Sequence, residues 1–444
     1  MRLSHLRAIP SVLVMSGFAA VFLSYYDSYL YDKGRLTYPS VKLFILALVG
    51  VSAWTFVRAA ASKPVRNEVI ALYAAHRNVI IGLIGVVMAS FISGFIPTAY
   101  LEDGPRYLMF PAYDVAIILL SMLLPFPEHR RRQFWPYLLV GFAVALGSVF
   151  IDTIHPGTYS INPDRAAGFI QNPNGAAFLL VALCASIISF ERVRPMDLAV
   201  LFATAIGVLA TFSRGGGLVF VFVVLCYTYC AVVQVRERPV RALGRALAMV
   251  LLAALTVQAA RVLTKRVEIF STDSRLGILS GRQKMIPAHE PRLQALDESL
   301  QLVRESPVLG RGGGFTNKTM RQAPHNIYLQ QWINSGLLGL VAFLWTLAAA
   351  GHLFWTRRYR NGIVFVALIA IEGLFNHNLL EERAFLVPLG VLLTLSFYAA
   401  PARAAEARAR EVALPPHPRR HPPPRARLAA VARAVQARAV GGPE

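Results

Sequence analysis

Residues 322–340 read QAPHNIYLQQWINSGLLGL. Here a polar segment turns into an apolar run that continues to about residue 354, and His325 stands at the junction. About 20 helical residues cross the hydrocarbon core of a bilayer. The stretch therefore predicts a membrane helix whose first turn, at the membrane surface, is preceded by a histidine.

The composition extends this prediction to the whole chain. Of its 444 residues, 55% are hydrophobic and 16% are charged, whereas a soluble domain is about a quarter charged. The formal charge of +21 does not indicate a nucleic-acid partner, because the arginines fall between apolar runs and in the tail, as membrane topology predicts. The three cysteines all lie in apolar stretches, so neither a disulfide framework nor a zinc site is expected.

Twelve apolar runs are long enough to be membrane spans, and we predict an all-α polytopic membrane protein. The first run lacks a clear cleavage site for a signal peptidase and is interpreted as a retained helix. The predicted spans are roughly 9–26, 40–61, 79–99, 107–125, 134–154, 167–190, 197–213, 216–235, 243–263, 327–354, 361–379 and 384–400.

Charge alternates along the connections between these spans. Every second connection is basic, for example EHRRR (128–132) and TRRYR (356–360), and both chain ends are basic too. Since basic connections stay in the cytoplasm, this pattern places both termini there. Residues 1–400 form the membrane domain in this prediction, and 401–444, rich in Ala, Arg and Pro, form a disordered basic cytoplasmic tail.

A long polar loop, residues 264–324, separates the ninth span from the tenth and is predicted on the outer side. Long loops translocate largely regardless of their charge. Within the loop, Leu293, Leu296, Leu300 and Val303 recur at helical spacing, which predicts an amphipathic helix lying over the membrane domain.

Three arginines, Arg165, Arg214 and Arg282, recur at the outer ends of spans or in the loop. Arg suits phosphate because its planar guanidinium donates two parallel hydrogen bonds. Arg214 precedes three glycines at a helix start, which suits an anion, but a tight interhelical turn with an arginine reaching the headgroups explains the same residues. Asn172 and Asn174 flank a proline and are either substrate amides or a capped helix start.

His325 is the candidate base. The positive end of a helix dipole disfavours the imidazolium form, and a neutral imidazole can take a proton. The alternative is that His325 merely caps the helix. A second polar cluster, His377, Glu381 and Glu382, either orients substrate or pairs with Arg383. No spaced set of ligands indicates a metal.

Five segments in a fixed order carry a resemblance to a known family: RAAGFIQNPNGAAF (165–178), FSRGGG (212–217), SGRQKM (280–285), ESPVLGRGGGF (305–315) and PHNIYLQQWINSGLLGL (324–340). Together they resemble the O-antigen ligase and polymerase superfamily of bacterial membrane glycosyltransferases. The resemblance covers about residues 160–345 through motifs and the other spans through topology.

The resemblance implies a GT-C-type enzyme of the inner membrane, with its active site and the long loop on the periplasmic face. Such ligases move a glycan from undecaprenyl diphosphate to a sugar hydroxyl of lipid A-core, without metal, nucleotide or other cofactor. The family's histidine maps onto His325 and its arginines onto Arg214, Arg165 and Arg282. We therefore predict His325 and Arg214 as catalytic residues, and Arg165, Arg282, Asn172, Asn174 and Asn326 as substrate-binding residues. The segment after Arg282 is longer than the family's usual spacing.

Other functions fit the same sequence. An O-antigen polymerase or a protein O-oligosaccharyltransferase of the superfamily carries the same motifs. A transporter of lipid-linked glycans fits twelve spans, but transporters place key polar residues at the membrane midplane. The candidate residues here are expected to gather at one face, which favours surface chemistry.

Overall fold

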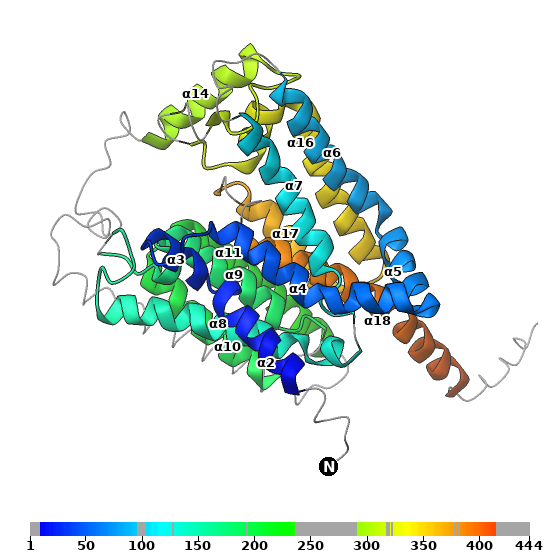
Figure 1. Ribbon diagram of the computed structural model, residues 1–444. Helices are drawn as coiled ribbons and strands as arrows, with labels where there is room; N and C mark the ends of the chain where they lie inside the picture. Colours follow the sequence, from blue (N-terminus) through cyan, green and yellow to red (C-terminus); the bar gives the residue numbers. More distant parts are fainter. Residues whose placement is uncertain are drawn as a thin grey trace, which may run out of the picture. The chain divides into compact units, whose positions relative to one another are not determined.

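The computed structural model describes residues 9–95, 104–126, 128–162, 164–191, 194–235, 291–316, 320, 323–376, 379 and 382–413. These residues form helices joined by turns, and no strand occurs among them (Figure 1). Met1–Phe397 form one compact unit, described below. Of the second unit, Tyr398–Glu444, the structure describes the part up to Ala413, which is the last part of a helix.

Every predicted span within the described residues coincides with a helix, while the ninth, 243–263, lies outside them. Within the described part of the chain, five helices contain stretches long and apolar enough to cross a membrane, and five more apolar helices are shorter. The chain is thus a multi-pass helical membrane protein. The helices are α2 (Ile9–Phe18), α3 (Tyr26–Asp32), α4 (Ser40–Ala61), α5 (Lys63–Ala75), α6 (Arg77–Gly94), α7 (Gly104–Ser121), α8 (Glu128–Ile154), α9 (Pro173–Ile187), α10 (Pro195–Thr211), α11 (Arg214–Val235), α14 (Pro291–Glu305), α16 (Ile327–Thr356), α17 (Arg360–Glu372) and α18 (Arg383–Ala413).

Several boundaries differ from the prediction. The first span passes through a π-helical turn, Ala19–Leu23, and then breaks at Tyr25, whose φ is 65°. The sixth begins at Pro173 rather than 167, because proline is favoured at the start of a helix. The eleventh ends at Glu372, not 379. The twelfth continues to Ala413, past residue 401, because its Ala- and Arg-rich sequence has high helix propensity.

Neighbouring helices run in alternating directions, as the contacts at their ends show. At one end, the Tyr25 hydroxyl donates to Glu382 over 3.1 Å and the Ile327 amide donates to the Gly373 carbonyl over 2.8 Å. At the opposite end, Asn361 donates to the carbonyl of Ile188 over 2.7 Å. The first end contains the connections predicted to be periplasmic, and we call it the outer end. Which side of the membrane it faces stays a prediction.

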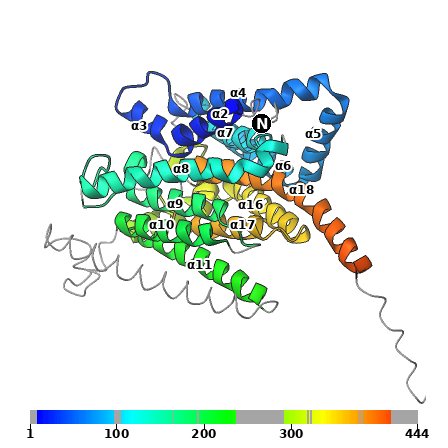
Figure 2. The ribbon, with the colours of Figure 1, turned by 90° about the horizontal axis from the view of Figure 1, so that it is seen from below.

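The core lies around α9. All residues from Ala176 to Ile187 are buried, and α8, α10, α11 and α17 pack against them. Figure 2 shows α9 enclosed by these neighbours. A helix that is apolar on all sides is expected at such a central position, and α9 fixes the outer ends of the helices that pack against it.

The tenth span, α16, is sharply kinked at Gly336, whose backbone (φ 66°, ψ −168°) is open essentially to glycine alone. The kink takes Ile333 and Asn334 out of regular helical bonding. Their carbonyls instead accept hydrogen bonds from Arg311 N over 2.7 Å and Gly312 N over 3.0 Å. The glycine-rich turn 310–315 therefore holds the end of the long loop against the kink.

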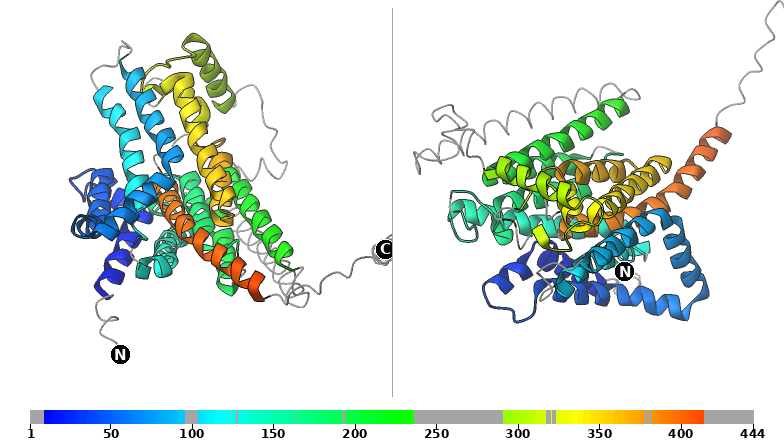
Figure 3. Two further views of the ribbon diagram at one scale, coloured as in Figure 1. Left: turned by 90° about the vertical axis from the view of Figure 1, so that its right-hand side faces the viewer. Right: turned by 90° about the horizontal axis from the view of Figure 1, so that it is seen from above.

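The amphipathic helix predicted in the loop is present as α14, which packs beside the start of α16 (Figure 3). Its buried face matches the prediction in part. Val303 is buried as predicted and clusters with Ile333 of α16. Ala295 and Ser299 are buried too, whereas Leu296 and Leu300 are 40% and 39% exposed.

Candidate functional site

The candidate site is the place where the starts of α9, α11 and α16 lie at the outer end of the protein. Arg165 joins two of the helices that end there. Its Nε donates to the Thr211 carbonyl and its Nη2 to Asn174 Oδ1, each over 2.8 Å. Arg165 thus links the end of α10 to the start of α9 and holds the side-chain amide of Asn174 in place.

Asn172 caps α9. Its side-chain oxygen accepts a hydrogen bond from the Asn174 amide over 3.0 Å. A 3₁₀ turn, Gly168–Ile170, and Gln171 in the left-handed region (φ 61°) precede it, so the helix start is capped, which was one of the two predicted readings of these residues. Both asparagines have structural roles, and their contact with a substrate stays a prediction.

Arg214 is the first residue of α11 and is exposed. A tight turn separates α10 from α11, with Phe212 at φ 49°, and the Ser213 hydroxyl accepts a hydrogen bond from the Gly216 amide over 3.2 Å. A Cβ on Gly215 would stand 3.1 Å from the Phe178 ring and 3.6 Å from Phe375 Cβ. The glycines therefore let α11 approach α9, while the guanidinium of Arg214 stays at the surface.

His325 precedes α16 and is half-buried, with a left-handed backbone (φ 44°). Asn326, not His325, caps this helix, because its Oδ1 accepts from Tyr328 N over 2.9 Å and Leu329 N over 3.1 Å. The alternative that His325 serves as the cap is therefore wrong. A left-handed conformation is uncommon for residues other than glycine, and such strain gathers at functional sites.

A buried carboxyl, Glu372, lies close to the same place and was not predicted from the sequence. It ends α17, directly before Gly373, whose carbonyl binds the start of α16. Its Oε2 is buried and makes no hydrogen bond within the described residues, and its Oε1 stands 3.5 Å from Asn376 Nδ2. The sequence signal that could have identified Glu372 is a single acidic residue within an otherwise apolar run.

The second polar cluster is only partly described. His377 and Glu381 lie outside the described residues, as does Arg282. Arg383 pairs with Asp27, with Nη1 and Oδ2 2.7 Å apart and both side chains buried. Among the described residues, no three His, Cys, Asp or Glu side chains gather as a metal site would require, and the expectation of a metal-independent reaction stays a prediction.

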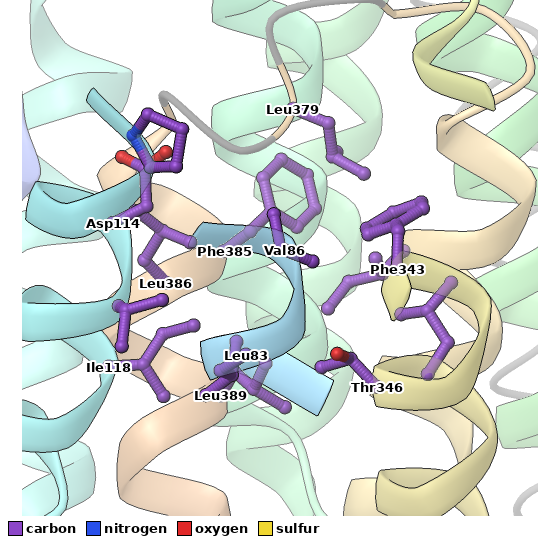
Figure 4. A pocket seen from close by; sticks show the side chains of 14 residues that line it. Leu83, Val86, Asp114, Ile118, Phe343, Thr346, Leu379, Phe385, Leu386 and Leu389 are labelled. Carbon is purple, nitrogen blue, oxygen red and sulfur yellow. The ribbon is translucent and has the colours of Figure 1, made fainter. Parts of the chain in front are cut away.

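An apolar pocket lies deeper, among α6, α7, α16, α17 and α18 (Figure 4). Asp114 and Thr346 are the polar side chains in a lining that is otherwise hydrocarbon or proline. None of the predicted site residues lines it. The site residues instead lie at helix ends on one face, which is the arrangement expected of surface chemistry and not of a transporter's midplane site.

Fold and site together define a multi-pass membrane protein with polar and cationic residues gathered at one end of its helices. Residues 199–344 match the family model described as O-antigen ligase. This match supports the assignment of the chain to the O-antigen ligase family, and the resemblance predicted from the ordered motifs is confirmed. The matched range includes Arg214, Arg282, His325 and Asn326 and begins after Arg165, Asn172 and Asn174. No curated protein matches the chain.

Proposed function

We propose that the protein is an O-antigen ligase that transfers the glycan of undecaprenyl diphosphate to a sugar hydroxyl of lipid A-core at the periplasmic face of the inner membrane. The family match supports a ligase- or polymerase-type function in general. The observation that carries the finer proposal is the position of His325, which is held at the start of α16 in a strained backbone while Asn326 supplies the cap.

His325 takes the proton of the acceptor hydroxyl as its oxygen attacks the anomeric carbon of the donor. The bond between that carbon and the diphosphate oxygen breaks, the leaving diphosphate keeps the electron pair, and the single displacement inverts the anomeric carbon. Arg214, Arg165 and Arg282 offset the negative charge that grows on the diphosphate. Fixed donors of this kind stabilise a transition state without reorganising.

The apolar pocket of Figure 4 offers a place for part of the isoprenoid chain of the carrier. Its hydrocarbon side chains come from α6, α7, α16, α17 and α18 and from Leu379. Pockets for apolar ligands are typically lined in this way, with few polar groups that fix orientation. In this arrangement the carrier chain lies within the membrane domain, while the diphosphate stays near the helix ends.

The proposal is tested by supplying His325 variants to a strain that lacks its own copy of this chain. His325→Asn is the sharpest variant, because asparagine tolerates the left-handed backbone but is no base at neutral pH. Loss of a general base lowers the rate about 10²–10⁴-fold. Long undecaprenyl-linked O-antigen should accumulate, and lipopolysaccharide should carry none.

The control is His352→Asn, which changes an exposed histidine at the other end of α16 and should leave attachment intact. Full attachment by His325→Asn would refute the base assignment. Lipopolysaccharide capped with a single repeat would instead identify a polymerase, because the ligation step would still operate.

A further inference from the structure

Four aromatic rings form a cluster at the outer end that the proposed chemistry does not use. Tyr26 and Tyr29 come from α3, and Tyr159 and Phe169 come from the connection between α8 and α9. Phe169 lies at the centre, with ring centroids 4.9 Å from Tyr26, 5.6 Å from Tyr29 and 5.0 Å from Tyr159. Tyr26 is 37% exposed and the other three rings are partly exposed, so the cluster presents aromatic surface to the outside.

The connection that carries Tyr159 and Phe169 is held rigidly by one buried carboxylate. Asp152, at the end of α8, accepts hydrogen bonds from four backbone amides: those of Tyr159 at 3.0 Å, Ser160 at 3.1 Å, Ala167 at 2.8 Å and Gly168 at 3.3 Å. The rings are therefore fixed in position before any ligand arrives, which lowers the entropy cost of binding.

Polar groups border the rings on the side of the candidate site. Gln171 Nε2 donates to the exposed carboxylate of Asp32 over 2.9 Å. Burial, with smaller contributions from Tyr29 and Asp152, raises the pKa of Tyr159, so its hydroxyl stays a hydrogen-bond donor at neutral pH. Gln171 directly precedes Asn172, and the cluster is thus continuous with the residues that surround Arg165.

Aromatic faces beside a carboxylate, an amide and hydroxyls suit a carbohydrate. A pyranose ring has an apolar C–H face that packs on an aromatic ring and hydroxyls at its edge that bond to polar groups. We propose that Tyr26, Tyr29, Tyr159 and Phe169, with Asp32 and Gln171, form a subsite for the sugars of the donor glycan that adjoin its diphosphate.

The position of the cluster favours sugars of the donor, and not those of the acceptor, as its ligand. The inference rests on the proposed function, in which Arg165 and Arg214 bind the diphosphate. The first sugars are covalently attached to that diphosphate, so they must lie within a few ångströms of it. The cluster reaches Arg165 through the short run from Gln171 to Asn174.

The first test is kinetic and uses the full-length purified protein. The donor is undecaprenyl-linked glycan extracted from the bacterium that encodes the chain. Tyr26→Ala should raise the KM for this donor roughly tenfold, about 1.4 kcal/mol of lost binding, with kcat and the acceptor KM unchanged. Tyr31→Ala is the matched control, because Tyr31 is on the same helix and 39% exposed but lies outside the cluster.

Asp32→Ala changes an exposed side chain of the same subsite without removing a packed ring. It should raise the donor KM in the same way, so the proposal stays testable even if Tyr26→Ala fails to fold. A rise in the acceptor KM alone, or no change in either constant, would overturn the proposal.

A binding measurement separates this inference from the proposed function. The oligosaccharide released from the donor is added to the His325→Asn protein, and saturation-transfer NMR reports the sugar protons that touch it. A second substitution in the same protein, Tyr26→Ala, should weaken those signals, and Tyr31→Ala as the second substitution should not. If His325→Asn remains active but the signals still depend on Tyr26, the base assignment fails and the subsite stands. If Tyr26→Ala leaves the signals unchanged, the subsite is refuted, whether or not His325→Asn is active.

Discussion

The kink in α16 provides the sharpest prediction, because Gly336→Ala changes a single methyl group. The Cβ of an alanine there would stand 2.6 Å from the carbonyl carbon of Leu309 and closer still to Val308. All these atoms belong to the backbone, which cannot move aside as a flexible side chain can. The backbone conformation itself, at φ 66° and ψ −168°, costs an alanine about 1–3 kcal/mol.

Relief of this contact requires the turn to separate from the helix. The separation breaks the hydrogen bonds from Arg311 N to Ile333 and from Gly312 N to Asn334, together with those that Leu337 N and Trp332 Nε1 donate to Pro307 over 3.0 and 2.9 Å. At about 1 kcal/mol each, the four bonds and the strain together destabilise the folded state by about 5–7 kcal/mol.

The assay compares thermal unfolding in detergent with the rate of glycan transfer. Gly336→Ala should lower Tm by several degrees and transfer by about 10²-fold or more, because a displacement of about 1 Å at a reacting group has that effect. Gly351→Ala is the control: its Cβ would meet nothing nearer than 3.8 Å, and alanine favours the helix. Wild-type stability and transfer in Gly336→Ala would refute the reasoning.

Two further predictions concern buried charge. Arg383→Ala leaves the carboxylate of Asp27 buried without its partner and should lower the free energy of unfolding by about 3–5 kcal/mol. The double variant Arg383→Ala with Asp27→Asn should regain stability. An unchanged Tm for Arg383→Ala alone would contradict the prediction. Burial lowers the pKa of His76 from 6.5 to about 4. Between pH 4 and pH 6.5 the unfolded state therefore binds more protons than the folded state. Stability is then complete above pH 6.5 and falls by up to about 3 kcal/mol as the pH drops towards 4. His76→Gln should flatten this pH dependence of Tm, and parallel curves for the two proteins would contradict it.

The lengths of the apolar runs and the charges between them predicted the helices well, because both depend only on residues close together in the sequence. The bounds of α4, Ser40–Ala61, are those expected from its apolar run. The end of α17 was missed because its last turns depend on contacts from far along the chain. The Gly373 carbonyl binds the start of α16, and this bond stops α17 at Glu372 although the apolar character continues to Phe375.

Periodicity identified α14 as a helix but not its buried face. Of the predicted apolar residues, Val303 is buried in a cluster with Ile333 of α16, whereas Leu296 and Leu300 stay partly exposed while the small side chains Ala295 and Ser299 are buried. For the site, the sequence singled out His325 and Asn326 but not their division of roles, since capping depends on the backbone angles at the junction.

The anchoring of the connection between α8 and α9 has an evolutionary consequence. The carboxylate of Asp152 binds main-chain amides, which every residue except proline possesses, so the course of this connection does not depend on which side chains it displays. The side chains at positions 159 and 169 can therefore be replaced without a new backbone course. If the proposed subsite binds sugar, its preference can change through single substitutions at these two positions.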